Sequence, residues 1–112
     1  MADKVSAIWV LRRDGSALLQ HRDDKPGLRH ANMWVPPGGH ADPGESMADC
    51  ARRELQEETE YDAPNLRFLM TLNRVHEDGV PFQVAEFWCW YDEIQTIVCH
   101  EGQGMAFVKR AE

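Results

Sequence analysis

Two stretches of the chain, residues 5–11 and 82–91, are apolar at both alternating sets of strand positions. A strand that is apolar on both faces belongs in a sheet covered on both sides. The chain offers only one amphipathic helical segment, residues 46–60. We therefore expect the second covering layer to come either from another subunit or from a C-terminal helix, beginning near Lys109, that the chain lacks.

The single helix has two competing start signals. Asp42 with Glu45, and Ser46 with Asp49, both match the pattern of an N-cap and an acidic residue three positions later. Gly44 lies inside the first pattern and so favours a helix that begins at Ser46. Further strands are expected at residues 17–19, 66–72 and 105–108, with a polar loop at 21–32.

Composition narrows the possible partners. The chain has 112 residues, which is room for a single domain spanning 1–112. Its 19 acidic residues against 12 Lys and Arg give a net charge of -7, which disfavours nucleic-acid polymers and anionic membranes. An acidic protein can still handle phosphates when a divalent cation lies between its carboxylates and the substrate.

The sequence also suggests a compartment. No apolar run approaches the roughly 18 residues of a membrane span, and the N-terminus lacks the layout of a secretion signal. Cys50, Cys89 and Cys99 form no Cys-x-x-Cys pair. We expect reduced thiols in a cytoplasmic protein.

The strongest functional signal is a fixed spacing of glycine, arginine and glutamate. Gly39 is followed after five residues by Glu45 and after seven more by the segment RELQEE. On a helix, the three glutamates of this segment, Glu54, Glu57 and Glu58, fall within about 100° of one another beside the apolar stripe. Such like charges repel, and a hard divalent cation with oxygen ligands, Mg²⁺ or Mn²⁺, would relieve the repulsion. The six positions match by chance about once in 10⁷ windows, which makes a merely solvated acidic face a poor explanation.

Residues 39–61 resemble the Nudix box, the glycine loop and helix that bind metal in Nudix hydrolases. The resemblance implies an α/β fold with a mixed sheet between helices, the C-terminal helix being short or absent here. It implies a Mg²⁺-dependent or Mn²⁺-dependent enzyme that cleaves the pyrophosphate of a nucleoside diphosphate linked to another moiety. One departure is Glu60, which stands where the family places glycine.

The resemblance also assigns roles to individual residues. The metal ligands would be Glu54, Glu57, Glu58 and the Gly39 carbonyl. Arg53 would orient a box carboxylate, and Gly38 and Glu45 would support the junction of loop and helix. Glu101, in a Glu-Gly-Gln similar to that of the nucleotide-pool cleaning members, would be a further metal ligand or the catalytic base, with a solvated loop acid as the alternative.

Substrate contacts and substrate class stay open at this point. Arg22 and Arg29 are candidate phosphate contacts in a loop that could equally be a solvated connector. Trp34, beside the glycine loop, is a candidate wall of the substrate pocket. We expect a nucleoside triphosphate as substrate, with ADP-ribose or a nucleotide sugar as alternatives, and a non-hydrolysing nucleotide-binding module as the competing class. We also expect a homodimer that covers the bare face of the sheet.

Overall fold

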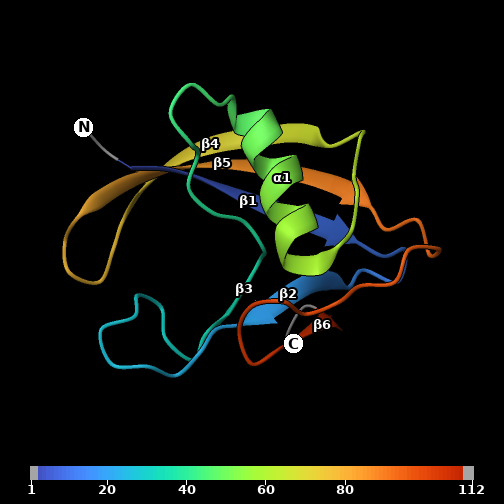
Figure 1. The fold of residues 1–112 in the computed structure, drawn as a ribbon, viewed down its shortest axis with the longest axis horizontal. Coiled ribbons are helices and arrows are strands. Elements are labelled where there is room, and N and C mark those ends of the chain that lie inside the picture. The colour runs from blue at the N-terminus through green and yellow to red at the C-terminus, as the bar shows by residue number, and fades with distance from the viewer. Residues whose placement is uncertain (1–2, 110–112) are drawn as a thin grey trace.

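The computed structural model describes residues 3–109, which form a mixed sheet of six strands and one helix (Figure 1). In chain order the elements are β1 (Asp3–Leu11), β2 (Ala17–His21), β3 (Trp34–Val35), α1 (Met47–Thr59), β4 (Arg67–Val75), β5 (Pro81–Trp90) and β6 (Gly104–Val108). The strand order is β3-β2-β1-β5-β4, and β6 pairs with β2. This confirms the α/β fold with a mixed sheet.

The two strands that are apolar on both faces lie side by side in the middle of the sheet. β1 and β5 run parallel, and their register extends from Asp3 beside Phe82 to Leu11 beside Trp90. On one face of this pair, residues such as Ile8 and Phe87 are buried against α1. Figure 1 shows the helix crossing this face. Because the central strands have neighbours on both sides, their apolar pattern matches their position.

Helix α1 begins and ends with defined caps. The Ser46 hydroxyl accepts a hydrogen bond from the Asp49 amide at 3.1 Å, which confirms the second of the two start signals. Ala51 and Leu55 are fully buried in the core, so the apolar stripe packs as its spacing predicts. At the other end Glu60 adopts the left-handed conformation, with φ 63°, and its amide donates to the Gln56 carbonyl.

The glycine loop fills a gap in the sheet. β1 and β2 pair only where Leu11 meets Ala17, next to their hairpin. Towards its beginning β1 instead pairs with the loop that precedes α1: the Ser6 amide donates to the Gly39 carbonyl at 2.8 Å, and the Ile8 amide donates to the Pro37 carbonyl at 2.9 Å. The loop is therefore fixed to the central strand of the fold.

The opposite face of the sheet carries no helix within residues 3–109. Trp9 and Trp88 lie beside each other on this face and are half-buried, and Trp90 is 42% exposed. β4 is longer and more exposed than expected, because it is an edge strand that α1 does not cover. A helix beginning near Lys109 would lie mainly in residues 110–112, which are outside the described residues. No helix in the described part of the chain has the length and apolar character needed to cross a membrane.

Candidate active site

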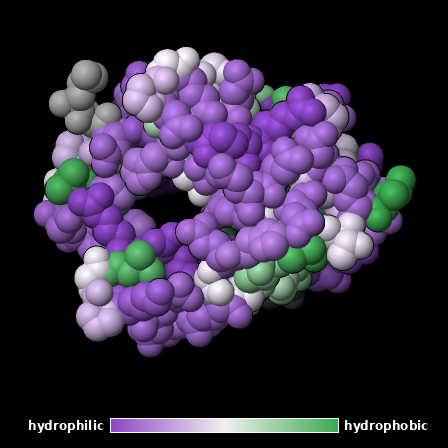
Figure 2. Space-filling model, viewed as in Figure 1, coloured by the Kyte–Doolittle hydropathy of each residue, from purple (hydrophilic) through white to green (hydrophobic). Residues whose placement is uncertain are grey.

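A cleft of about 740 Å³ opens beside the glycine loop and the helix. Its walls come from the glycine loop, α1, the loop before β3, the β4–β5 hairpin and the loop before β6. Figure 2 shows it as a hollow on the face of the molecule that carries α1. Four of the residues predicted as catalytic or metal-binding line this cleft: Gly39, Glu54, Glu58 and Glu101. Gly38, predicted to support the junction of loop and helix, lines it as well.

Two glycines allow the loop, strand and helix to approach closely. A Cβ atom at Gly38 would lie 2.0 Å from the Ser6 carbonyl oxygen, so no side chain fits between the loop and β1. A Cβ atom at Gly39 would lie 2.5 Å from a carboxylate oxygen of Glu54, so the Glu54 carboxylate lies directly against the loop. The Gly38 amide also donates to the Glu58 carboxylate at 3.0 Å.

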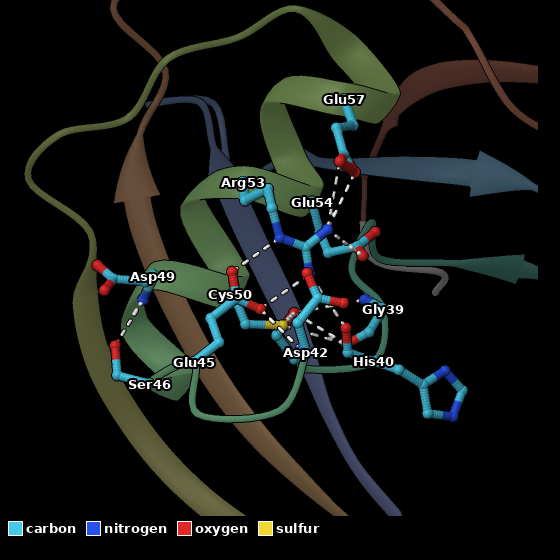
Figure 3. Close-up of polar contacts among 11 residues, drawn as sticks. Gly39, His40, Asp42, Glu45, Ser46, Asp49, Cys50, Arg53, Glu54 and Glu57 are labelled. Carbon is cyan, nitrogen blue, oxygen red and sulfur yellow. Dashed lines mark hydrogen bonds and ion pairs between the residues drawn. The ribbon is translucent and has the colours of Figure 1, made fainter.

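Arg53 ties the loop to the helix. Its guanidinium donates to both carboxylate oxygens of Glu45, at 2.7 and 2.9 Å, and to Glu54 and Glu57 at 2.9 and 3.0 Å (Figure 3). It also donates to the His40 carbonyl at 3.2 Å. The hydrogen bond from Arg53 lowers the pKa of Glu45 to about 2, and the same bond raises the pKa of Arg53. A guanidinium offers five donors in a fixed planar geometry, whereas an ammonium group offers three donors on a flexible stem.

Three carboxylates meet inside the cleft. Glu58 is 5% exposed, and burial together with the hydrogen bond to Glu101 raises the pKa of Glu58 to about 9. Burial also raises the pKa of Glu54, against the lowering effect of Arg53. The charge of Glu101 also raises the pKa of both Glu54 and Glu58.

These carboxylates fit a hard divalent cation by their chemistry. They offer oxygen ligands that repel one another, Glu58 is buried, and Glu54 lies directly against the glycine loop. Among residues 3–109, however, no three His, Cys, Asp or Glu side chains already converge on a common point at metal-binding distance. Arg53 explains part of this, because it engages Glu54 and Glu57. The Glu57 side chain is 58% exposed and lies outside the lining of the cleft.

The candidate substrate residues divide into two groups. Arg22 and Arg29 both line the cleft, and the Arg22 side chain donates to the Arg29 carbonyl at 3.0 Å. The Arg29 guanidinium forms an ion pair with Asp78 at 2.9 Å, which links this loop to the β4–β5 hairpin. Trp34 does not line the cleft, because its ring stacks on His21 with centroids 4.6 Å apart.

The sequence did not indicate the aromatic end of the cleft. His76 stacks on Phe82 with ring centroids 3.9 Å apart, and His30 lies beside His76 with ring nitrogens 3.4 Å apart. All three line the cleft. The available signal was that His76 and Phe82 lie on either side of Glu77-Asp78-Gly79, a segment typical of a turn, but only the hairpin register shows that they meet.

Comparison with known proteins agrees with the fold and the motif. A family model described as the NUDIX domain matches residues 2–103. The chain is 61% identical over 53 residues to the m7GpppN-mRNA hydrolase NUDT17 of Xenopus laevis, covering 47% of this chain and 18% of that protein. It is 44% identical over 56 residues to a putative 8-oxo-dGTP diphosphatase of Bacillus subtilis (strain 168), covering 50% of this chain and 34% of that protein.

A solved structure agrees over nearly the whole chain. The MutT protein from Methanosarcina mazei Go1 superposes with a TM-score of 0.82 and 19% identity, covering 96% of this chain and 77% of that chain. At this identity the likeness shows the fold alone. The curated relatives are matched over 18% and 34% of their own length. The family model covers most of the chain, and residues 39–61 carry the motif on the loop and helix where the fold requires it; the chain belongs to the Nudix family.

Proposed function

We propose that this protein is a metal-dependent pyrophosphohydrolase that acts on a small nucleotide. The observation that carries the proposal is the meeting of Glu54, Glu58 and Glu101 in one cleft that Arg22 and Arg29 also line. Carboxylates that can bind a cation, with arginines in the same cleft, suit a substrate that is itself a chain of phosphates.

The residues at the cleft suggest which groups would bind the cation and which would contact the phosphates. Glu54, Glu58 and Glu101 would hold Mg²⁺ or Mn²⁺, and Glu57 would join them once released from Arg53. The Gly39 carbonyl, which the resemblance also assigns to the metal, already accepts from the Ser6 amide at 2.8 Å and from the Ser6 hydroxyl at 3.4 Å. The cation would supply neutralisation of charge on the phosphoryl oxygens. Arg53 fixes the glutamates relative to the loop, and Arg22 and Arg29, which line the same cleft, would contact the phosphates of the substrate.

The alternative role that we propose for Glu101 is to accept the proton of the attacking water instead of binding the cation. Glu101 lies on a loop outside the crowded helix, and Glu58 next to it has its pKa raised to about 9 by burial and by Glu101 itself. A carboxylate paired with a second acid can take up and share a proton.

A nucleoside triphosphate is the substrate we favour. Two of the curated relatives are named for an m7GpppN-mRNA and for 8-oxo-dGTP, both of which contain a nucleotide with a chain of phosphates. The cleft has the volume of a small-molecule site. ADP-ribose or a nucleotide sugar is the alternative within the enzyme class, and a nucleotide-binding module without hydrolysis is the alternative outside it.

The cysteines bear on where the protein works. Cys50 and Cys89 are buried and Cys99 is exposed, and all three are free thiols. Free thiols of this kind suit a reducing compartment. We therefore propose a cytoplasmic protein.

One screen tests the function. The protein is incubated with Mg²⁺ and (d)NTPs, ADP-ribose, NADH, dinucleoside polyphosphates or nucleotide sugars, and release of phosphate or pyrophosphate is followed. We expect turnover of a nucleoside triphosphate, abolished by chelation and reduced about 10²-fold or more in Glu58→Gln. Binding of nucleotides without any turnover would instead favour the non-hydrolysing module.

A second comparison tests the role of Glu101. Glu93→Gln is the control, because Glu93 pairs with Arg12 at the surface and lies outside the cleft. Loss of a base keeps Glu101→Gln slow at every Mg²⁺ concentration, whereas loss of a ligand is partly restored by high Mg²⁺. If Glu101→Gln matches Glu93→Gln within a few-fold throughout, Glu101 has no chemical role.

A further inference from the structure

Glu60 ends the helix in a conformation that glycine adopts more easily. Its φ is 63°, in the left-handed region, and its amide donates to the Gln56 carbonyl at 2.8 Å as the helix terminates. An L residue is strained there relative to glycine. Because the sequence has glutamate here and not glycine, we look for a contact of the Glu60 side chain that offsets this strain.

That side chain reaches the loop that carries Glu101. The His100 ring nitrogen Nε2 lies 2.5 Å from the Glu60 carboxylate. Because a carboxylate only accepts, the imidazole is the donor. The two side chains are 48% and 56% exposed, so this contact adds little to the core of the protein.

The backbone of the same loop is held to the helix end. The His100 amide donates to the Glu58 carbonyl at 2.9 Å, and the Val98 amide donates to the Thr59 carbonyl at 2.9 Å. Residues 98–100 therefore run beside the last residues of α1. The hydrogen bond between Glu60 and His100 closes this arrangement one residue before Glu101.

The far side of Glu101 is held by β2. The Gln20 side chain donates to the Glu101 carbonyl at 2.7 Å. Gly102, with φ 86°, packs so closely that a Cβ atom there would lie 2.5 Å from the His21 carbonyl oxygen. The backbone is therefore held on both sides of Glu101: His100 is bonded to the helix end, and the Glu101 carbonyl and Gly102 contact β2.

We propose that Glu60 and His100 form a positioning pair, which keeps Glu101 beside Glu58 in the cleft. To make this contact, the chain has a strained glutamate at the helix end, where glycine would be relaxed. This inference rests on the proposed function for its catalytic consequence. The placement of the loop by Glu60 and His100 does not depend on the proposed function. A glycine at position 60 would relax the backbone but leave His100 without its acceptor.

The test separates stability from activity by means of a matched control. Glu93 is a second glutamate in the left-handed region, with φ 61°, and its carboxylate pairs with Arg12 at 2.7 Å away from the cleft. Glu60→Gly and Glu93→Gly therefore remove the same kind of strain and the same kind of surface contact. Only Glu60→Gly should affect the loop that carries Glu101.

Three measurements are made on both variants. We expect melting temperatures equal to or above the unmodified protein for both. For Glu60→Gly alone we expect faster hydrogen exchange at the His100 and Glu101 amides without metal, and a fall in kcat of about tenfold with little change in KM. Glu60→Gln, which still accepts a hydrogen bond, should restore most of kcat. A double variant with His100→Ala should be no slower than His100→Ala alone.

The outcomes distinguish this pair from the proposed function. If the unmodified protein hydrolyses no nucleotide, the proposed function fails, and hydrogen exchange still decides whether Glu60 holds the loop. Unchanged exchange at residues 98–101 in Glu60→Gly overturns the pair, as does a kcat equal to that of Glu93→Gly in an active enzyme.

Discussion

Glu58 is a buried acid that lines the cleft beside Glu101. Its pKa rises from the ordinary 4.5 to about 9, first because of burial and then because of Glu101. Between these two values the folded protein keeps a proton that the unfolded chain releases. The free energy of unfolding contributed by Glu58 is therefore fully present below pH 4.5 and is lost as the pH rises towards 9.

This predicts a pH-dependent difference between the metal-free protein and Glu58→Gln. The amide of the variant does not titrate, so we expect similar melting temperatures near pH 5 and a more stable variant near pH 9. Mg²⁺ should reverse the order at neutral and higher pH, because binding to the native carboxylates stabilises the unmodified protein. Thermal unfolding in chelator and in Mg²⁺ at pH 5, 7 and 9 measures both effects. A difference that stays constant from pH 5 to 9 in chelator would show that Glu58 titrates normally.

Arg53 gives a second prediction at this scale. Arg53→Lys keeps the charge but loses the planar set of donors that reaches Glu45, Glu54 and Glu57 together. Losing an orienting contact of this kind costs roughly 10- to 100-fold in metal affinity or activity. Arg52→Lys is the matched control, because Arg52 contacts Asp62 with two donors and lies outside the cleft. Mn²⁺ affinity and kcat are measured in both variants. Equal losses in Arg52→Lys and Arg53→Lys would show that Arg53 does not orient the glutamates.

The helical period places the glutamates of the site near one another, and the sequence could predict this much. It could not predict that Glu57 would turn towards Arg53 and away from the cleft, because the two side chains are four residues apart on the helix surface and several rotamers satisfy the spacing. Nor could it predict that His76 meets Phe82, which depends on the register of β4 and β5.

At the scale of elements, the loop before α1 depends on its close approach to β1. Gly38→Ala would place a Cβ atom 2.0 Å from the Ser6 carbonyl oxygen, and this is backbone that cannot rotate away. We expect a loss of roughly 1–3 kcal/mol from overpacking, and the Gly38 φ of 155°, which L side chains rarely adopt, adds backbone strain. Activity should also fall, since the Gly38 amide that contacts Glu58 would move.

Gly44→Ala is the control for this prediction. Gly44 also has a positive φ, 78°, but nothing lies within 4 Å of the Cβ atom that it would gain. Its cost should be limited to backbone strain, about 1 kcal/mol. Chemical denaturation of both variants gives the comparison. Equal losses in the two would mean that the loop and β1 separate easily and that the contact does not matter.

Elements with a strong pattern were predictable, and those that depend on distant partners were not. β1, β5 and α1 follow from their periodicity, and Ser46 from its cap. β3 has two residues and exists only because β2 offers an edge. The exposure of β4 could not be predicted from its alternating residues, because alternation indicates a buried face but not the layer that would bury it.

The whole molecule has one face of the sheet packed on α1 and the other face bare within residues 3–109. The bare face includes Met70 and Trp90, each 42% exposed. The guanidinium groups of Arg13 and Arg67 partly cover it, lying over Trp90 at 3.8 Å and over Trp88 at 5.4 Å from the ring centroids. β4 adds an edge strand with unpaired backbone groups.

We predict that two copies of the chain associate through this face and the β4 edge. Large apolar side chains that lie close together on a sheet are stable in water when a second surface covers them. Sedimentation at increasing concentration should show a dimer, and Met70→Glu should shift it towards monomer by at least tenfold in Kd. Ile94→Glu is the control: Ile94 is 84% exposed but lies in a turn after β5, so its change should leave Kd unaltered. A monomer at high micromolar concentration, or equal effects of the two variants, would mean that the arginines lying over the tryptophans suffice to keep this face in water.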